Sequence, residues 1–248
     1  PHKLISQFLN LMVLFLINNK LGLIAAGLYA VSKKFGKPLS FIVSMIQTAW
    51  SPYKFDIHKN EENPALVFKN LISIYWITLI SLWSLLSLIS PTLFKFLIDD
   101  RYWEAIPFIP FIMFVSVAEG FKFTVSTGFE LSKDQKQASK ISFYTLIFTL
   151  AILYISFDFF KPYNFIICHI LSSIFFGFYI YTKAKKIILI SYPFKLIVSF
   201  LIVTVFIVIC AYQLNSNFLT ILTLLFIQII TSVLMTLKII RFNKFKII

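Results

Sequence analysis

Polar residues in this chain are confined to short gaps between long apolar runs. A bilayer core about 30 Å thick is crossed by roughly 20 mostly apolar helical residues. The pattern therefore predicts about eight membrane helices, at residues 4–21, 23–50, 66–89, 106–129, 141–157, 162–181, 193–213 and 218–240. Because open strands would leave backbone groups without partners in lipid, the fold class expected is an all-α, polytopic transmembrane helix bundle.

The gaps between these runs contain residues that favour turns. The Asn-Asn-Lys triplet at 18–20 is expected to turn the chain after the first helix, and Ser51-Pro52 is expected to end the second. Residues 52–64 form a polar loop. Residues 91–104 form a loop on the opposite side that reads as a short interfacial segment with an aromatic anchor.

Composition excludes a soluble protein of this size. Hydrophobic residues make up 59% of the 248 residues, charged residues only 13%, and the mean hydropathy is +0.87. Cys168 and Cys210 lie inside apolar runs, and His2, His58 and His169 share no ligand spacing. The sequence therefore indicates no disulfide framework, no metal site and no cofactor.

The positive charges follow the side of the membrane. The net charge is +13, but the basic residues lie mainly at helix ends, which favours membrane orientation over nucleic-acid binding. Loops on one side hold fifteen Lys and Arg residues and those on the other side four, so both termini are expected in the cytoplasm. The lysines left over lie inside predicted helices: Lys33, Lys34, Lys37 and Lys122.

Several spaced segments share an order with a known family. They are GLYAVSKK at 27–34, TAWSPY at 48–53, ISP at 89–91, YWEA at 102–105 and IP at 109–110. Over about residues 5–190, this succession resembles the C-terminal half of polysaccharide-biosynthesis flippases of the MOP superfamily, which transport lipid-linked O-antigen and capsule repeat units. Where that family often has an acidic residue or an Asp-Arg pair, this chain has Asn10-Leu11-Met12.

The resemblance implies a fold, a cargo and a location. Residues 1–190 would form the C-terminal lobe, with about six helices, of a MATE-like two-lobe transporter, and residues 191–248 an additional helix pair with a basic tail. The cargo would be an undecaprenyl-pyrophosphate-linked oligosaccharide, moved by alternating access from the cytoplasmic to the periplasmic leaflet of a bacterial inner membrane. The partner would be an N-terminal lobe of the same protein, which the opening Pro1 also suggested. The protein would not be an enzyme.

Three lysines are the main candidate substrate-binding residues. Lys33, Lys34 and Lys37 occupy adjoining parts of one helical face, and Lys33 lies roughly 15 Å from the start of its predicted helix, near the middle of the bilayer. An unpaired ammonium group there costs at least about 2.5 kcal/mol. A wet cavity with an anionic pyrophosphate would compensate the three charges. Alternatively, Pro38 interrupts the helix and the lysines snorkel from a shorter span.

Glu119 and Lys122 are the other charges inside a predicted helix, three residues apart. They are expected to form a local ion pair, or else Glu119 binds a proton or Na⁺ and couples transport to an ion gradient. The Cys168-His169 pair is expected to pack against a neighbouring helix.

Two other classes of function remain open at this point. A membrane-embedded polysaccharide polymerase, ligase or acyltransferase would use acidic residues such as Asp99-Asp100, but it normally places its catalytic groups in a sizeable loop, and residues 91–104 are few. A MATE-like exporter of drugs or metabolites would share the fold and differ in the chemistry of its cavity.

Overall fold

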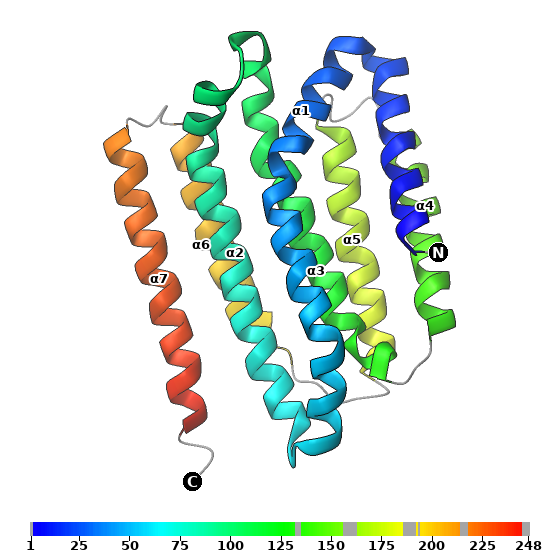
Figure 1. Cartoon of the computed structure of the whole chain (residues 1–248), viewed down its shortest axis with the longest axis vertical. Coiled ribbons are helices and arrows are strands. Elements are labelled where there is room, and N and C mark those ends of the chain that lie inside the picture. Colours follow the sequence, from blue (N-terminus) through cyan, green and yellow to red (C-terminus); the bar gives the residue numbers. More distant parts are fainter. Residues whose placement is uncertain are drawn as a thin grey trace. The chain divides into compact units, whose positions relative to one another are not determined.

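The computed structural model describes residues 2–131, 135–155, 163–185, 192, 194–213 and 218–244. Every regular element in these ranges is a helix, as the apolar runs predicted (Figure 1). The elements are α1 (His2–Asn60), α2 (Pro64–Leu97), the 3₁₀-helix η1 (Asp100–Phe108), α3 (Ile109–Leu131), α4 (Gln135–Ile155), α5 (Asn164–Ala184), α6 (Phe194–Gln213) and α7 (Phe218–Lys244).

Within the described residues, five helical stretches are long and apolar enough to cross a membrane. They are Leu11–Asn60, Pro64–Leu97, Asp100–Leu131, Asn164–Ala184 and Phe194–Gln213. Two further apolar stretches, Phe143–Ile155 and Phe226–Leu237, are shorter than a full span. The protein is therefore a helical membrane protein, but the expected count of about eight spans is not confirmed.

Helix α1 consists of two rods that meet at Gly22. Gly22 has φ 87° and ψ 172°, a backbone conformation that is essentially restricted to glycine. Figure 1 shows α1, in blue to cyan, folding back on itself after its first rod. The expectation that residues 18–20 turn the chain was thus close but wrong in detail, because the helix continues through them to the glycine.

Neither proline in the second rod ends the helix. The sequence predicted a stop at Ser51-Pro52, yet α1 continues to Asn60, and it also continues through Pro38. Packing explains why both prolines are tolerated: Leu39 is buried just after Pro38, and Lys54 is buried just after Pro52. In a membrane helix, such contacts outweigh the hydrogen bond that each proline removes. The expectation that Pro38 interrupts the helix is therefore wrong, and snorkelling of the lysines stays an alternative.

The two predicted loops are shorter in the structure than in the sequence analysis. Helix α2 runs through Pro91 to Leu97 and η1 begins at Asp100, so only a short link remains within the expected loop 91–104. The other expected loop, 52–64, is reduced to the residues between Asn60 and Pro64. Trp103 lies half-exposed on η1 and donates from Nε1 to the Ile98 carbonyl (3.2 Å). The aromatic anchor at the membrane interface stays a prediction.

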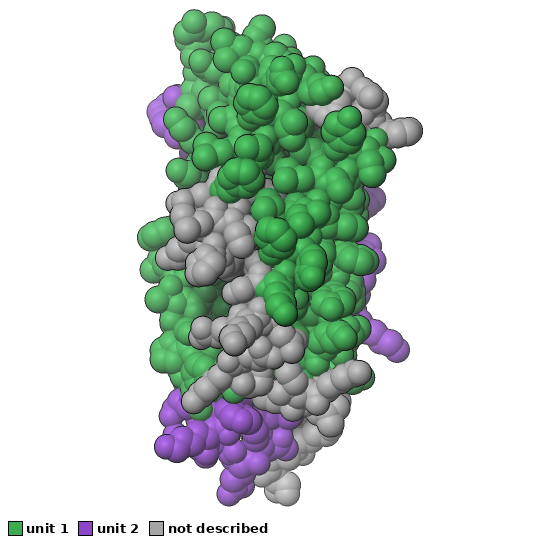
Figure 2. Space-filling model, turned by 90° about the vertical axis from the view of Figure 1, so that its right-hand side faces the viewer, with its two compact units in different colours: residues 1–55, 98–188 green, residues 56–97, 189–248 purple. Residues whose placement is uncertain are grey.

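The chain forms two compact units, coloured separately in Figure 2. Unit 1 consists of Pro1–Phe55 and Ile98–Ile188, and unit 2 of Asp56–Leu97 and Leu189–Ile248. Helix α2 thus belongs with α6 and α7. The expected division into a transporter lobe at 1–190 and an additional helix pair at 191–248 stays a prediction.

In unit 1, helix α3 packs along α5, and α4 also packs on α5. The α3–α5 contact is close because small residues face each other: a Cβ atom at Gly128 would lie 3.0 Å from the Cβ of Ala184. Near the other end, the rings of Phe108 and Tyr163 stack at 4.7 Å. The residue numbers of the two partners differ by nearly the same amount in both contacts, so α3 and α5 run parallel.

In unit 2, α2 packs on both α6 and α7. Leu88, Ile207 and Ala211 form a buried apolar cluster at the α2–α6 contact. The hydroxyl of Tyr212 is 3.0 Å from that of Ser90 and donates to the Ser87 carbonyl at 3.2 Å. Such hydrogen bonds commonly hold membrane helices together, because burial of apolar surface contributes little to helix association in lipid.

Candidate functional site

The three candidate lysines lie on an uninterrupted stretch of α1 in unit 1. Lys34 and Lys37 are exposed, whereas Lys33 is half-buried and its Nζ lies 5.6 Å from the centre of the Tyr29 ring. A cation over an aromatic face is stabilised by the ring quadrupole. The sequence placed these lysines on one helical face, and the continuous helix preserves that relation.

Contacts between α1 and its neighbours show where these lysines lie along α3. The Ser32 hydroxyl lies 3.1 Å from the Ala105 carbonyl, and a Cβ atom at Gly36 would lie 3.1 Å from Ile112 Cγ2. Lys33 is therefore level with the first turn of α3. The second rod of α1 is about 57 Å long, much longer than a bilayer core, so its length alone does not fix where the bilayer lies, and the depth of these lysines stays a prediction.

Glu119 joins residues from three helices. Its Oε1 lies 3.4 Å from Nε2 of His169 on α5, and it interacts electrostatically with Lys33 on α1 and with Lys122 on α3. We call this group the charge cluster: Lys33, Glu119, Lys122 and His169. The local ion pair expected between Glu119 and Lys122 stays a prediction, because the structure shows only their electrostatic interaction. His169, which the sequence analysis assigned to packing, is a member of the charge cluster.

The charge cluster has more positive than negative charge. Its two ammonium groups face one carboxylate, and the exposed Lys34 and Lys37 lie close by on α1. Glu119 is 43% exposed although it lies midway along an apolar helix. Charges at such positions need water, an opposite charge or a bound ion. The arrangement therefore suits an anion better than a cation.

A second ion pair in unit 1 was not predicted. Lys54 Nζ pairs with Glu130 Oε2, and the Lys54 side chain is only 1% exposed. Glu130 also accepts a hydrogen bond from the Ser126 hydroxyl at 2.8 Å. The sequence analysis missed the pair because it placed Lys54 in a loop after Pro52 and did not single out Glu130. The signal in the sequence that could have indicated the pair is Lys54 itself, a charged residue two positions after Pro52.

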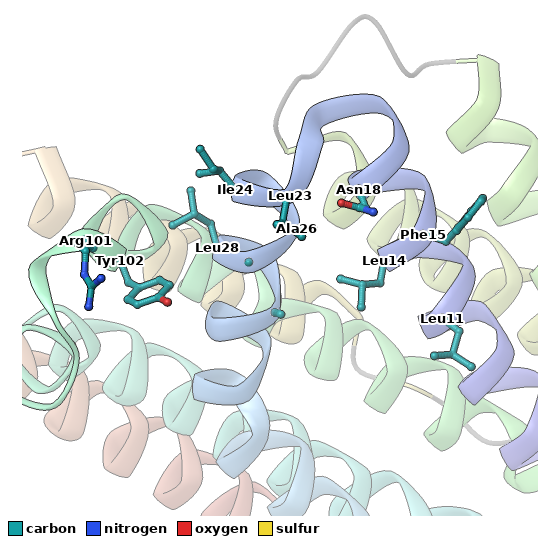
Figure 3. A pocket seen from close by; sticks show the side chains of 12 residues that line it. Leu11, Leu14, Phe15, Asn18, Leu23, Ile24, Ala26, Leu28, Arg101 and Tyr102 are labelled. Atoms are coloured by element: carbon teal, nitrogen blue, oxygen red, sulfur yellow. The ribbon is translucent and has the colours of Figure 1, made fainter.

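A cleft of about 860 Å³ lies in unit 1 beside the break in α1 (Figure 3). The first rod contributes apolar side chains to one side, the start of the second rod forms the floor, and η1 contributes the other side. Its lining residues are Leu11, Leu14, Phe15, Asn18, Leu23, Ile24, Ala26, Gly27, Leu28, Ala30, Arg101 and Tyr102. The lining is mainly apolar, with its few polar groups on the two sides.

Asp99, at the start of η1, forms its hydrogen bonds with Arg101 and Asp100 at the protein surface. Asp99 Oδ1 lies 2.9 Å from Arg101 Nε, and Asp99 also caps η1 by accepting from the Arg101 backbone N–H. These hydrogen bonds from Arg101, followed by one from Asp100, lower the pKa of Asp99 to about 2. A carboxylate with so low a pKa is a weak base.

No group of three or more His, Cys, Asp or Glu side chains that could hold a metal ion occurs among the residues that the structure describes. Comparison of the chain with models of protein families, with curated proteins and with solved structures gave no match. The site must therefore be interpreted from its own geometry and from the sequence resemblance described above.

Proposed function

We propose that this protein is one lobe of a membrane transporter that moves an undecaprenyl-pyrophosphate-linked oligosaccharide from the cytoplasmic to the periplasmic leaflet of a bacterial inner membrane. The observation that supports this most is the excess of positive charge in unit 1: Lys33, Lys34 and Lys37 on α1, joined by Lys122 across Glu119. A pyrophosphate group supplies the negative charge that these lysines need inside apolar helices.

The charge balance also separates this proposal from a MATE-like exporter of small molecules. A cavity that selects cationic drugs needs net negative charge, whereas the charge cluster has two ammonium groups and one carboxylate. An exporter of anionic metabolites would use the same lysines. The order of motifs along residues 5–190, which resembles the flippases, favours a lipid-linked cargo over a free metabolite.

A membrane polymerase or ligase is the alternative from another class. Its best candidate base was the Asp99-Asp100 pair, but the pKa of Asp99 is about 2 and its side chain is held by Arg101. A general base that operates near neutral pH requires a carboxyl group with a much higher pKa. The geometry at this position therefore favours a structural cap over a catalytic base.

The test is display of the surface glycan by the host. Lys33→Gln combined with Lys37→Gln, made in the chromosomal gene, should reduce surface polysaccharide at an unchanged amount of membrane-inserted protein. Arg at one of these positions should restore part of the display, because it keeps the charge. A matched control is Lys59→Gln, which removes an exposed lysine at the far end of α1. If the double variant displayed as much surface polysaccharide as the native protein, Lys33 and Lys37 would have no role in transport.

A further inference from the structure

The apolar cleft and the exposed lysines lie on the same face of α1. Lys34 follows Gly27 by seven residues, and Lys37 follows Ala30 by seven. Seven residues are close to two helical turns, so each lysine lies about 10 Å further along the line of a residue that lines the cleft. Apolar cleft and positive charge therefore form one continuous surface.

This surface has the polarity of an amphiphile. Along the second rod, Leu23, Ile24 and Leu28 line the cleft, and Leu23 and Ile24 are 79% and 80% exposed. On the first rod, Leu11 and Phe15 are 66% and 61% exposed. Side chains of this kind gain most from contact with hydrocarbon, whereas Lys34 and Lys37 gain from contact with an anion.

We propose that the cleft holds the hydrocarbon chain of a lipid whose phosphate group lies against Lys34 and Lys37. This inference rests on the proposed function, because the cargo named there is such a lipid, and it assigns the two parts of that cargo to different parts of one helix face. The chain points toward η1, and the phosphate lies about two turns away, level with the start of α3. A cleft of about 860 Å³ has room for several isoprene units.

Gly27 gives a direct way to test the chain site. A Cβ atom added there meets nothing within 4 Å, so a larger side chain enters the cleft without pushing on the backbone. Gly27→Phe should therefore fill part of the cleft and leave the fold intact. Thr48→Phe is a matched control, since it places the same side chain at an exposed position about 30 Å further along α1.

The measurement is equilibrium binding to the purified protein in nanodiscs, with geranylgeranyl pyrophosphate and inorganic pyrophosphate as probes. Gly27→Phe should weaken binding of the lipid probe about tenfold and leave inorganic pyrophosphate unaffected. Lys34→Gln with Lys37→Gln should weaken binding of both probes. Thr48→Phe should change neither.

Equal affinity of Gly27→Phe and the native protein for the lipid probe would overturn the chain site, as would equal affinities of the native protein for the two probes. Binding is measured without transport, so the two proposals fail separately. If the cleft binds the lipid probe as described but the lysine variants display normal glycan, the proposed transport function fails and the cleft assignment stands. If glycan display depends on the lysines but Gly27→Phe binds the lipid probe normally, the cleft assignment fails and the proposed transport function stands.

Discussion

The buried ion pair of Lys54 and Glu130 should respond unequally to the loss of each partner. Lys54 is 1% exposed, so Glu130→Gln leaves an ammonium group buried without its counter-charge. Breaking a buried pair in this way costs about 3–5 kcal/mol. Glu130 is 33% exposed and keeps its hydrogen bond from Ser126, so Lys54→Met leaves a carboxylate that water can reach. We expect a loss of only about 1–2 kcal/mol there.

A double-mutant cycle measures this asymmetry. In Lys54→Met/Glu130→Gln both charges are gone, so the double variant should be more stable than Glu130→Gln alone, although it contains one more substitution. The assay is reversible unfolding in mixed micelles, followed by tryptophan fluorescence as the denaturing detergent increases. Asp99→Asn serves as the control, because the Asp99–Arg101 pair is at the surface and its loss should leave the unfolding curve unchanged.

Two results would refute the reasoning. If the effects of the two single substitutions simply add in the double variant, Lys54 and Glu130 do not interact. If Lys54→Met destabilises the protein as much as Glu130→Gln, the difference in burial between the two side chains does not determine the cost. Charge reversal, Lys54→Glu with Glu130→Lys, gives an independent check, since it should recover part of the lost stability.

Three further predictions follow from other parts of the chain. Gly22→Ala should destabilise the protein by about 1–3 kcal/mol, because alanine cannot easily adopt φ 87°, whereas Gly27→Ala should not, because its Cβ meets open space; equal effects in thermal unfolding would contradict this. Single cysteines at Lys136 and Lys185 should be shielded from an impermeant thiol reagent in intact cells, and ready labelling would reverse the predicted topology. Asp99→Asn should leave glycan display unchanged from pH 5 to 8, because a carboxylate with a pKa of about 2 is too weak a base to take up a proton in that range, and asparagine can still accept the cap hydrogen bond; loss of display would support the enzyme alternative.

The helices could be predicted from the sequence because lipid leaves few choices for an apolar run of this length. Residues 66–89 fall inside α2, residues 106–129 fall inside η1 and α3, and residues 194–213 of the helix predicted at 193–213 form α6. The ends were predicted less well. Pro52 is a stop signal in an isolated helix, and only the burial of Lys54 against α3 shows why the helix continues. The predicted boundaries at 157, 162 and 193, and part of the loop charges, lie outside the described residues.

The candidate site was predicted only in part, because residues distant in the sequence meet there. The charges inside helices pointed to Lys33, Glu119 and Lys122 individually. The contact of Glu119 with His169 depends on the parallel register of α3 and α5, which no local pattern specifies. The cleft was missed for a similar reason. It forms where α1 folds back at Gly22, and the turn signal at residues 18–20 does not specify the angle between the two rods.

The most direct test of the account is the rate of lipid transfer in proteoliposomes. A fluorescent oligosaccharide linked to undecaprenyl pyrophosphate is placed in both leaflets, and its movement is followed by quenching from outside. At equal amounts of the full-length native protein, Lys34→Gln with Lys37→Gln should slow transfer at least about tenfold, and Lys34→Arg with Lys37→Arg should retain most of the rate. Equal rates for the native protein and the Gln variant would show that these lysines do not handle the pyrophosphate and would contradict the proposed function.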